Sequence, residues 1–192
     1  MLLRNIINDY IPCDEQEEKD KEQMLMFIDS FDDVLTRNNV IGHFTASAFV
    51  VNKEKNKMAA VYHIITDGWT YPGGHADGEE NLLLVALREA EEETGLKVKV
   101  LNDKPFLISS NPVESHIKHG KLVSSHIHFD VIYLIEADEN KPLEYREDES
   151  KGVKWIPFDE IDNEKMVDII RPIAKKLSKK LIEKGVNISV WK

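Results

Sequence analysis

The sequence is short of the features that would place it in a specialised class of protein. Cys13 is the only cysteine among 192 residues, which excludes an intramolecular disulfide and a cysteine-rich metal site. No apolar run approaches the roughly 18 residues that a membrane span requires. The polar start MLLRNIINDY is not typical of a secretory signal. We therefore expect a cytoplasmic protein without a membrane partner.

Basic residues are also scarce, 25 against 35 acidic ones, so that the net charge is −10. This charge repels nucleic-acid backbones and anionic membranes, so a polynucleotide partner is not expected. A small phosphorylated ligand stays compatible with it through a bound cation. The apolar share of 42% and the charged share of 31% are ordinary for a globular chain of one domain.

Hydrophobic patterning predicts strands and helices in one chain. Alternating, β-branched or aromatic runs predict a hairpin over 42–52 and 57–66, a strand from Leu96, one long strand over 121–137 and a short strand ending at Pro157. Spacings of three and four predict an amphipathic helix within 14–35 and a terminal helix over 164–185, kinked or divided by Pro172 and ended by Gly185. The mixture indicates an α/β or α+β fold.

The stretch WTYPGGHADGEENLLLVALREAEEETGL, residues 69–96, predicts a glycine-rich loop followed by a helix. Asn81 is the expected N-cap and Gly95 the expected C-terminal stop. The core-facing stripe is expected to comprise Leu83, Leu87, Ala90 and Thr94. The remaining surface of this helix is rich in acid.

Glu89, Glu92 and Glu93 fall within one arc of that helix, beside the core stripe. Like charges at these spacings cost roughly 0.2–0.5 kcal/mol per pair, and they crowd the end where the helix dipole favours cations. A divalent cation such as Mg²⁺ or Mn²⁺ would remove the repulsion, because both ions prefer oxygen ligands. Taken alone, the cluster is equally compatible with a solvated helix end on which Arg88 forms a surface ion pair.

The wider spacing decides between these readings. From Gly74, five residues precede Glu80, seven more precede Arg88-Glu89, and the run then continues Ala-Glu-Glu-Glu-Thr-Gly-Leu to Leu96. This resembles the Nudix box of MutT-like hydrolases, Gly-x5-Glu-x7-Arg-Glu-U-x-Glu-Glu-x-Gly-U with U aliphatic, at every fixed position. A weaker resemblance extends over about 42–162.

The resemblance implies an α/β/α sandwich with a mixed β-sheet. We expect a Nudix hydrolase domain over 41–192, including a long C-terminal helix that lies outside the minimal family pattern, with 1–40 as a helical segment packed on it. The resemblance also implies a metal-dependent enzyme that cleaves a pyrophosphate bond in a nucleoside diphosphate linked to another moiety. A nucleoside triphosphate, ADP-ribose, a nucleotide sugar and a dinucleotide all stay open as the small-molecule partner, and so does a homodimer. Pro112 is a weak cue for ADP-ribose.

The resemblance also implies roles for individual residues. Glu89, Glu92 and Glu93 would bind Mg²⁺ or Mn²⁺ and, with Arg88 as their orienting partner, form the catalytic set. Gly74 and Glu80 would contribute to cofactor binding. The family often recruits one further carboxylate from outside the box as base or ligand, and the candidates here are Glu144, Glu147, Asp148 and Glu149.

His126 and His128 lie two apart on the polar face of a predicted strand, where they could contact substrate or simply be exposed. His75 follows the glycine pair closely enough to reach a phosphate. Adding His116 and His119 suggests zinc, but no cysteine accompanies them and the loop sets no geometry, so a zinc site is not expected.

The main rival function is a catalytically silent Nudix-fold module that binds a ligand or regulates. Loss of hydrolysis usually shows as missing box glutamates, whereas all four are present here. Isoprenoid diphosphate isomerase chemistry, known in a branch of the fold, uses a cysteine region that Cys13 lies too far upstream to supply. Hydrolysis is therefore the expected activity.

Overall fold

The computed structural model describes residues 2–118, 120–148 and 150–183. Its helices are α1 (Leu2–Asp9), α2 (Glu15–Ser30), α3 (Leu82–Thr94) and α4 (Ile170–Glu183), with a 3-10 turn η1 (Phe158–Glu160). Its strands are β1 (Gly42–Val51), β2 (Lys57–His63), β3 (Gly68–Thr70), β4 (Gly73–His75), β5 (Val98–Val100), β6 (Leu107–Val113), β7 (His116–Lys118), β8 (Lys121–Val123), β9 (His126–Ala137) and β10 (Ser150–Pro157).

The main sheet has the order β10-β2-β1-β9-β5, with β3, β4 and β6 paired alongside β2, β1 and β9. Its centre is a long parallel pair, β1 and β9, in register from Gly42 opposite Ile127 to Val51 opposite Glu136. The other neighbours in this sheet are antiparallel. The expectation of a mixed sheet is confirmed.

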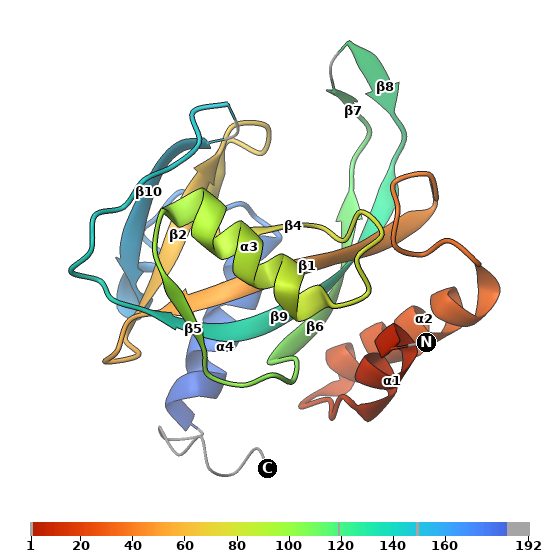
Figure 1. Ribbon diagram of the computed structural model, residues 1–192, viewed down its shortest axis with the longest axis horizontal. Coiled ribbons are helices and arrows are strands. Elements are labelled where there is room, and N and C mark those ends of the chain that lie inside the picture. Colours follow the sequence, from red (N-terminus) through yellow and green to blue (C-terminus); the bar gives the residue numbers. More distant parts are fainter. Residues whose placement is uncertain (1, 119, 149, 184–192) are drawn as a thin grey trace.

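Helices cover both faces of the sheet, because side chains alternate along each strand. Phe44 and Ala46 of β1 belong to the same buried cluster as α1, α2 and α3, whereas Phe49 and Val51 belong to a second cluster with α4. Figure 1 shows α3 lying across the front of the sheet and α4 behind it. This is the expected helix–sheet–helix layering. The division into 1–40 and 41–192 stays a prediction.

The predicted long strand over 121–137 is wrong in one respect. Strand pairing is interrupted at Ser124–Ser125, so that β8 pairs with β7 in a separate two-stranded sheet and only β9 joins the main sheet. Figure 1 shows this hairpin projecting from the body of the molecule. The hairpin of β1 with β2 is confirmed.

Both predicted terminal helices are shorter than expected. Asp14 caps α2 by accepting a hydrogen bond from the Glu17 N–H, and the chain is extended at Phe31, so the helix ends well before residue 35. α4 begins at Ile170, with Pro172 in its first turn rather than at a kink. A proline there breaks no helical hydrogen bond, since the first N–H groups have no intrahelical acceptor. The predicted stop at Gly185 lies outside the described residues.

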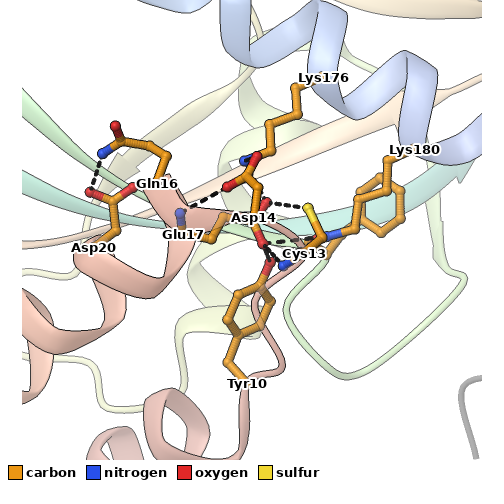
Figure 2. Close-up of polar contacts among 9 residues, drawn as sticks. Tyr10, Cys13, Asp14, Gln16, Glu17, Asp20, Lys176 and Lys180 are labelled. Atoms are coloured by element: carbon orange, nitrogen blue, oxygen red, sulfur yellow. Dashed lines mark hydrogen bonds and ion pairs between the residues drawn. The ribbon is translucent and has the colours of Figure 1, made fainter.

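A buried polar network joins the N-terminal helices to α4 (Figure 2). Glu17, whose side chain is 1% exposed, accepts hydrogen bonds from the Tyr10 hydroxyl at 2.6 Å and the Cys13 N–H at 2.9 Å. Lys176 lies 2.8 Å and Lys180 3.9 Å from its carboxylate. Burial alone would raise the pKa of Glu17, but these donors lower it. The carboxylate is therefore held ionised between two lysines from the opposite end of the chain.

Candidate active site

The acidic helix α3 begins and ends where its sequence predicts. Gly95 has a left-handed φ of 70° and donates its N–H to the Glu91 carbonyl, the expected C-terminal stop. A Cβ on Gly95 would lie 2.7 Å from the Cβ of Glu144, so the helix end also needs a glycine where the segment around Glu144 crosses it. Asn81 marks the start, but its side chain makes no capping hydrogen bond.

The buried stripe of α3 is rotated relative to the predicted one. Its members are Leu82, Val85, Ala86, Ala90, Glu93 and Thr94. Leu83 and Leu87 only pack against the edge of this core. The helix lies against β1 and β4, and this rotation carries Glu93 inward. The three carboxylates predicted to share one exposed arc are thus unequal in burial.

Glu93 and Glu89 reach the two adjacent glycines of β4. Glu93 is 6% exposed, and its carboxylate accepts a hydrogen bond of 3.0 Å from the Gly73 N–H. The Glu89 carboxylate lies over Gly74, where an added Cβ would fall 2.5 Å from its Cδ. The glycine pair therefore lets two carboxylates approach the backbone of one short strand.

Arginines hold the more exposed carboxylates. Arg88 donates to Glu89 at 2.9 Å, and this ion pair raises the pKa of Arg88. Arg146, from the loop that crosses the helix end, lies 3.7 Å from the Glu92 carboxylate, whose side chain is 45% exposed. Arg88 thus pairs with a box glutamate, and its orienting role stays a prediction.

Carboxylate oxygens on one helix face are a donor set that suits Mg²⁺ or Mn²⁺. Among the described residues, the groups of three potential ligands whose donor atoms all lie within 4.8 Å of one another do not include Glu89, Glu92 and Glu93. Glu93 is engaged with Gly73 and Glu92 is turned to Arg146. The residues present fit such a cation chemically once Glu92 leaves its arginine, and their roles stay a prediction.

The remaining predicted carboxylates that the structure describes lie in two loops, one between β4 and α3 and one after β9. Glu80 is exposed in the loop between β4 and α3. Glu144 is exposed and its N–H donates to the Thr94 carbonyl at 2.9 Å, which brings it to the helix end. Glu147 is exposed and Asp148 pairs with Arg146 at 3.0 Å. Glu149 lies outside the described residues.

The predicted pair His126 and His128 belongs to a larger histidine cluster on the other face of the sheet. Its further members are His43 of β1 and His75 of β4, with ring centroids 4.8–5.0 Å apart in the close pairs. His116 lies farther out, 6.4 Å from His126, and His119 lies outside the described residues. Sequence reasoning did not single out His43, although His43-x-Thr45-x-Ser47 and His126-x-His128-x-Asp130 are matched alternating patterns.

Asp130 is a second feature of this face that sequence reasoning left without a role. It is 4% exposed, and its carboxylate accepts hydrogen bonds of 2.9 Å from both Thr45 and Ser47. Burial raises its pKa to about 6, against the lowering effect of these hydroxyls. Burial likewise lowers the pKa of His43 and lowers that of His128 to about 2. The face thus favours neutral imidazoles.

In the described part of the chain, no helix is both long and apolar enough to cross a bilayer. Residues 42–177 match the family described as NUDIX domain. This region contains β1, the glycines of β4, the whole of α3 and most of α4.

Named relatives agree with this match. Nudix hydrolase 6 of Arabidopsis thaliana is 30% identical over 123 residues, which are 61% of this chain and 40% of that protein. The CMP-5'-(N-acetyl-N-hydroxy-3-aminopropyl)phosphonate hydrolase of Streptomyces rubellomurinus is 31% identical over 121 residues, 60% of this chain and 52% of that one. The chain spans about half the length of the curated relatives it matches.

A solved structure extends the likeness to the fold. The crystal structure of a NUDIX-family hydrolase from Clostridium perfringens has a TM-score of 0.51 and 25% identity, covering 71% of this chain and 96% of that one. The family match spans more than half of the chain and includes the complete box from Gly74 to Leu96. This chain therefore belongs to the Nudix family.

Proposed function

We propose that the chain is a pyrophosphohydrolase that cleaves the diphosphate linkage of a nucleoside diphosphate joined to another moiety, with Mg²⁺ or Mn²⁺ as cofactor. The observation that carries this proposal is the approach of Glu89 and Glu93 from one helix to the adjacent glycines Gly73 and Gly74. Family membership and the hydrolase names of the relatives support it.

The chain's own groups have separate tasks in this proposal. Glu93 is fixed by the Gly73 N–H, Glu89 is oriented by Arg88, and Glu92 completes the set after release from Arg146. A divalent cation held by these carboxylates would supply positive charge for the diphosphate and would polarise the attacking water. The water oxygen bonds to one phosphorus as the bridging P–O bond breaks. Glu144, Glu147, Asp148 and Glu149 stay candidates for the base or for an extra ligand.

The substrate panel follows from what the site leaves open. It contains nucleoside triphosphates, ADP-ribose, nucleotide sugars, NADH and dinucleoside polyphosphates, each with Mg²⁺ and with Mn²⁺. The Streptomyces relative is named for a CMP derivative, so a CDP conjugate is added. Products are identified by mass, with a nucleoside monophosphate as the expected fragment.

Two variants make the assay specific to this chain. Glu93→Gln removes a predicted ligand, whereas Glu91→Gln makes the same chemical change on the same helix at a residue that pairs with Lys97. We expect turnover of at least one substrate by the unchanged protein and by Glu91→Gln, and its loss in Glu93→Gln. Turnover that survives Glu93→Gln, or that needs no divalent cation, would refute the proposal.

The silent binding module is the alternative outcome of the same panel. It would give no product with any substrate, together with a rise in melting temperature on addition of one of them. The cytoplasmic location and the open question of a homodimer stay predictions, and light scattering of the purified chain measures the latter.

A further inference from the structure

We propose that His43, His75 and His128, with His126 beside them, form a binding site for a divalent transition-metal ion such as Zn²⁺. This site is separate from the carboxylates of α3 and lies on the opposite face of the sheet. It does not depend on the proposed hydrolytic function.

Strand register brings these histidines together from three distant parts of the sequence. β1 and β9 run parallel with His43 directly opposite His128, and the antiparallel pairing of β1 with β4 places His75 opposite Thr45. His43, His75 and His128 each offer a ring nitrogen such that all three atoms lie within 4.8 Å of one another. Three ligands are the protein's share in many sites that also bind a water or a fourth side chain.

The hydrogen bonds around the rings select the ligand atoms. His43 Nδ1 lies 3.4 Å from the Asn39 carbonyl and His126 Nδ1 lies 2.8 Å from the Ser124 carbonyl. A carbonyl oxygen can accept a hydrogen bond but cannot donate one, so each ring carries its proton on Nδ1 and presents a lone pair at Nε2. Protein metal sites typically orient histidine ligands in this way.

One of these lone pairs is left unsatisfied. His43 is 4% exposed, and its Nε2 is buried with no hydrogen-bond partner in the described part of the chain. His126 Nε2 and His128 Nε2 lie 3.1 Å apart, so a single proton on His128 can bridge that pair. No such proton serves His43, and a buried polar atom without a partner costs about 1–3 kcal/mol.

A transition-metal ion suits this cluster of neutral imidazole nitrogens better than a proton, Mg²⁺ or an anion does. Burial favours the neutral rings, which are the form that coordinates metal, whereas an anion needs charged imidazolium. Imidazole nitrogen suits Zn²⁺ and similar ions rather than Mg²⁺. Zn–N bonds of about 2.0–2.1 Å in a tetrahedron place neighbouring nitrogens about 3.3–3.4 Å apart. The 3.1 Å between His126 and His128 is already close to that spacing.

The site would have a structural consequence for the strand under the carboxylates. β4 carries Gly73 and Gly74 as well as His75, and it is held to the sheet through β1. A metal bound by His43, His75 and His128 would tie β4 to both central strands. We therefore expect one equivalent of Zn²⁺ to raise the melting temperature of the metal-free protein.

Cobalt provides the direct test. Metal-free protein is titrated with Co²⁺ in excess Mg²⁺, which occupies the carboxylates, and visible absorption reports nitrogen coordination; Zn²⁺ then displaces the Co²⁺. We expect one equivalent to bind. His75→Gln and His128→Gln should weaken binding by at least about 100-fold, since even outer-shell partners of a metal ligand contribute 10–100-fold. His63→Gln, at the last residue of β2 and outside the cluster, and Glu93→Gln should leave cobalt binding unchanged.

A second measurement avoids reliance on variants that fold poorly. In the unchanged protein, stoichiometric Zn²⁺ should shift the ring-nitrogen NMR signals of the four cluster histidines and leave those of His63 in place. Absence of Co²⁺ absorption, equal affinity in all histidine variants, or unshifted cluster signals would overturn the proposal. The proposal would also be overturned if the cluster bound inorganic phosphate and no metal, and if this phosphate binding were lost in His75→Gln and His128→Gln.

Discussion

Glu17 and Glu93 are both buried carboxylates on helices, but the chain surrounds them differently. Glu17 lies between Lys176 and Lys180 and accepts hydrogen bonds from Tyr10 and Cys13. Glu93 accepts a hydrogen bond from the Gly73 N–H and shares its helix with two more acids of the same box. In the first region the protein supplies the compensating cations; in the second it gathers acids beside a glycine pair.

The difference separates a structural use of buried charge from a functional one. A buried ion pair holds two segments in place, and removing one partner leaves an uncompensated charge. Acids clustered beside a glycine pair, with arginines on the more exposed members, are instead a site to which a cation can be added. Substitutions at Glu17 should therefore affect stability, and substitutions at Glu93 should affect activity.

The largest expected effect is on turnover. Glu92→Gln and Glu93→Gln should each lower kcat/KM on the order of 10³-fold, the upper range for removal of one preorganised electrostatic group. Melting temperature should change little. The comparison is with Glu91→Gln, which should keep near-normal kcat/KM in the same assay, and full activity in both Glu92→Gln and Glu93→Gln would contradict the proposed roles.

At Glu17, the corresponding substitution should lower the stability of the fold rather than the activity. Glu17→Gln leaves Lys180, which is 7% exposed, without its carboxylate, so the free energy of unfolding should fall by about 3–5 kcal/mol. Urea unfolding measures this loss, and kcat/KM of the folded fraction should be unchanged at low temperature. Arg4→Ala breaks only an exposed pair with Asp29 and serves as control. Equal stability of both variants would remove the structural role of Glu17.

Asp130 is a buried carboxylate of a third kind, held by hydroxyl groups, and it predicts a pH dependence. Its folded pKa is about 6 against an ordinary 3.8, so the folded state binds the proton more tightly. The stability from that proton is present below about pH 4 and is lost as pH rises through 6. The loss should be about 3 kcal/mol at 1.36 kcal/mol per pKa unit.

The measurement is the unfolding free energy of the unchanged protein minus that of Asp130→Asn. This difference should fall between pH 4 and pH 7, because asparagine does not titrate. Asp138→Asn is the control: hydrogen bonds with Asn140 lower the pKa of Asp138, so its contribution to stability changes only below about pH 4 and its difference should stay flat between pH 4 and pH 7. A flat profile for Asp130→Asn would show that the carboxyl is not held in its protonated form.

A backbone substitution tests the approach of Glu89 to β4. The added Cβ of Gly74→Ala would lie 2.5 Å from the Glu89 Cδ and must displace that carboxylate. A displacement of about 1 Å at a catalytic group can cost on the order of 10²-fold, and we expect that loss in kcat/KM. Gly152→Ala is the control, because its Cβ would meet only Trp69 at 3.7 Å. Normal activity of Gly74→Ala would mean that Glu89 acts from another position.

The sequence predicts the features of the acidic helix that depend on neighbouring residues. It does not predict those that depend on contacts between distant parts of the chain. The extent of α3, its stop at Gly95 and the acidic cluster are set within 23 residues, so spacing alone predicts them. The burial of Glu93 depends on how α3 rotates over β1 and β4, which spacing does not determine. That is why one expected carboxylate face is divided between core and surface.

The histidine cluster and the Glu17 network show the same limit. His43 lies beside His128 only because β1 and β9 pair in parallel register. The two strands are distant in sequence: Thr45 and Asp130, which pair two residues farther along, are separated by 85 residues. Glu17 meets Lys180 across nearly the whole chain. The split between β8 and β9 was missed because alternation continues through Ser124–Ser125 while the pairing partner changes.

The smallest expected effect concerns Arg146, whose exposed ion pair with Glu92 a bound metal ion would replace. Arg146 lies 3.7 Å from the Glu92 carboxylate, and both side chains are nearly half exposed, so Arg146→Ala should change the unfolding free energy by less than about 1 kcal/mol. The same change frees Glu92 from a competing cation. Mn²⁺ should therefore bind a few-fold more tightly to Arg146→Ala, measured by calorimetry, and no tighter to Arg4→Ala. Weaker Mn²⁺ binding to Arg146→Ala would mean that the arginine holds Glu92 in place for the metal rather than away from it.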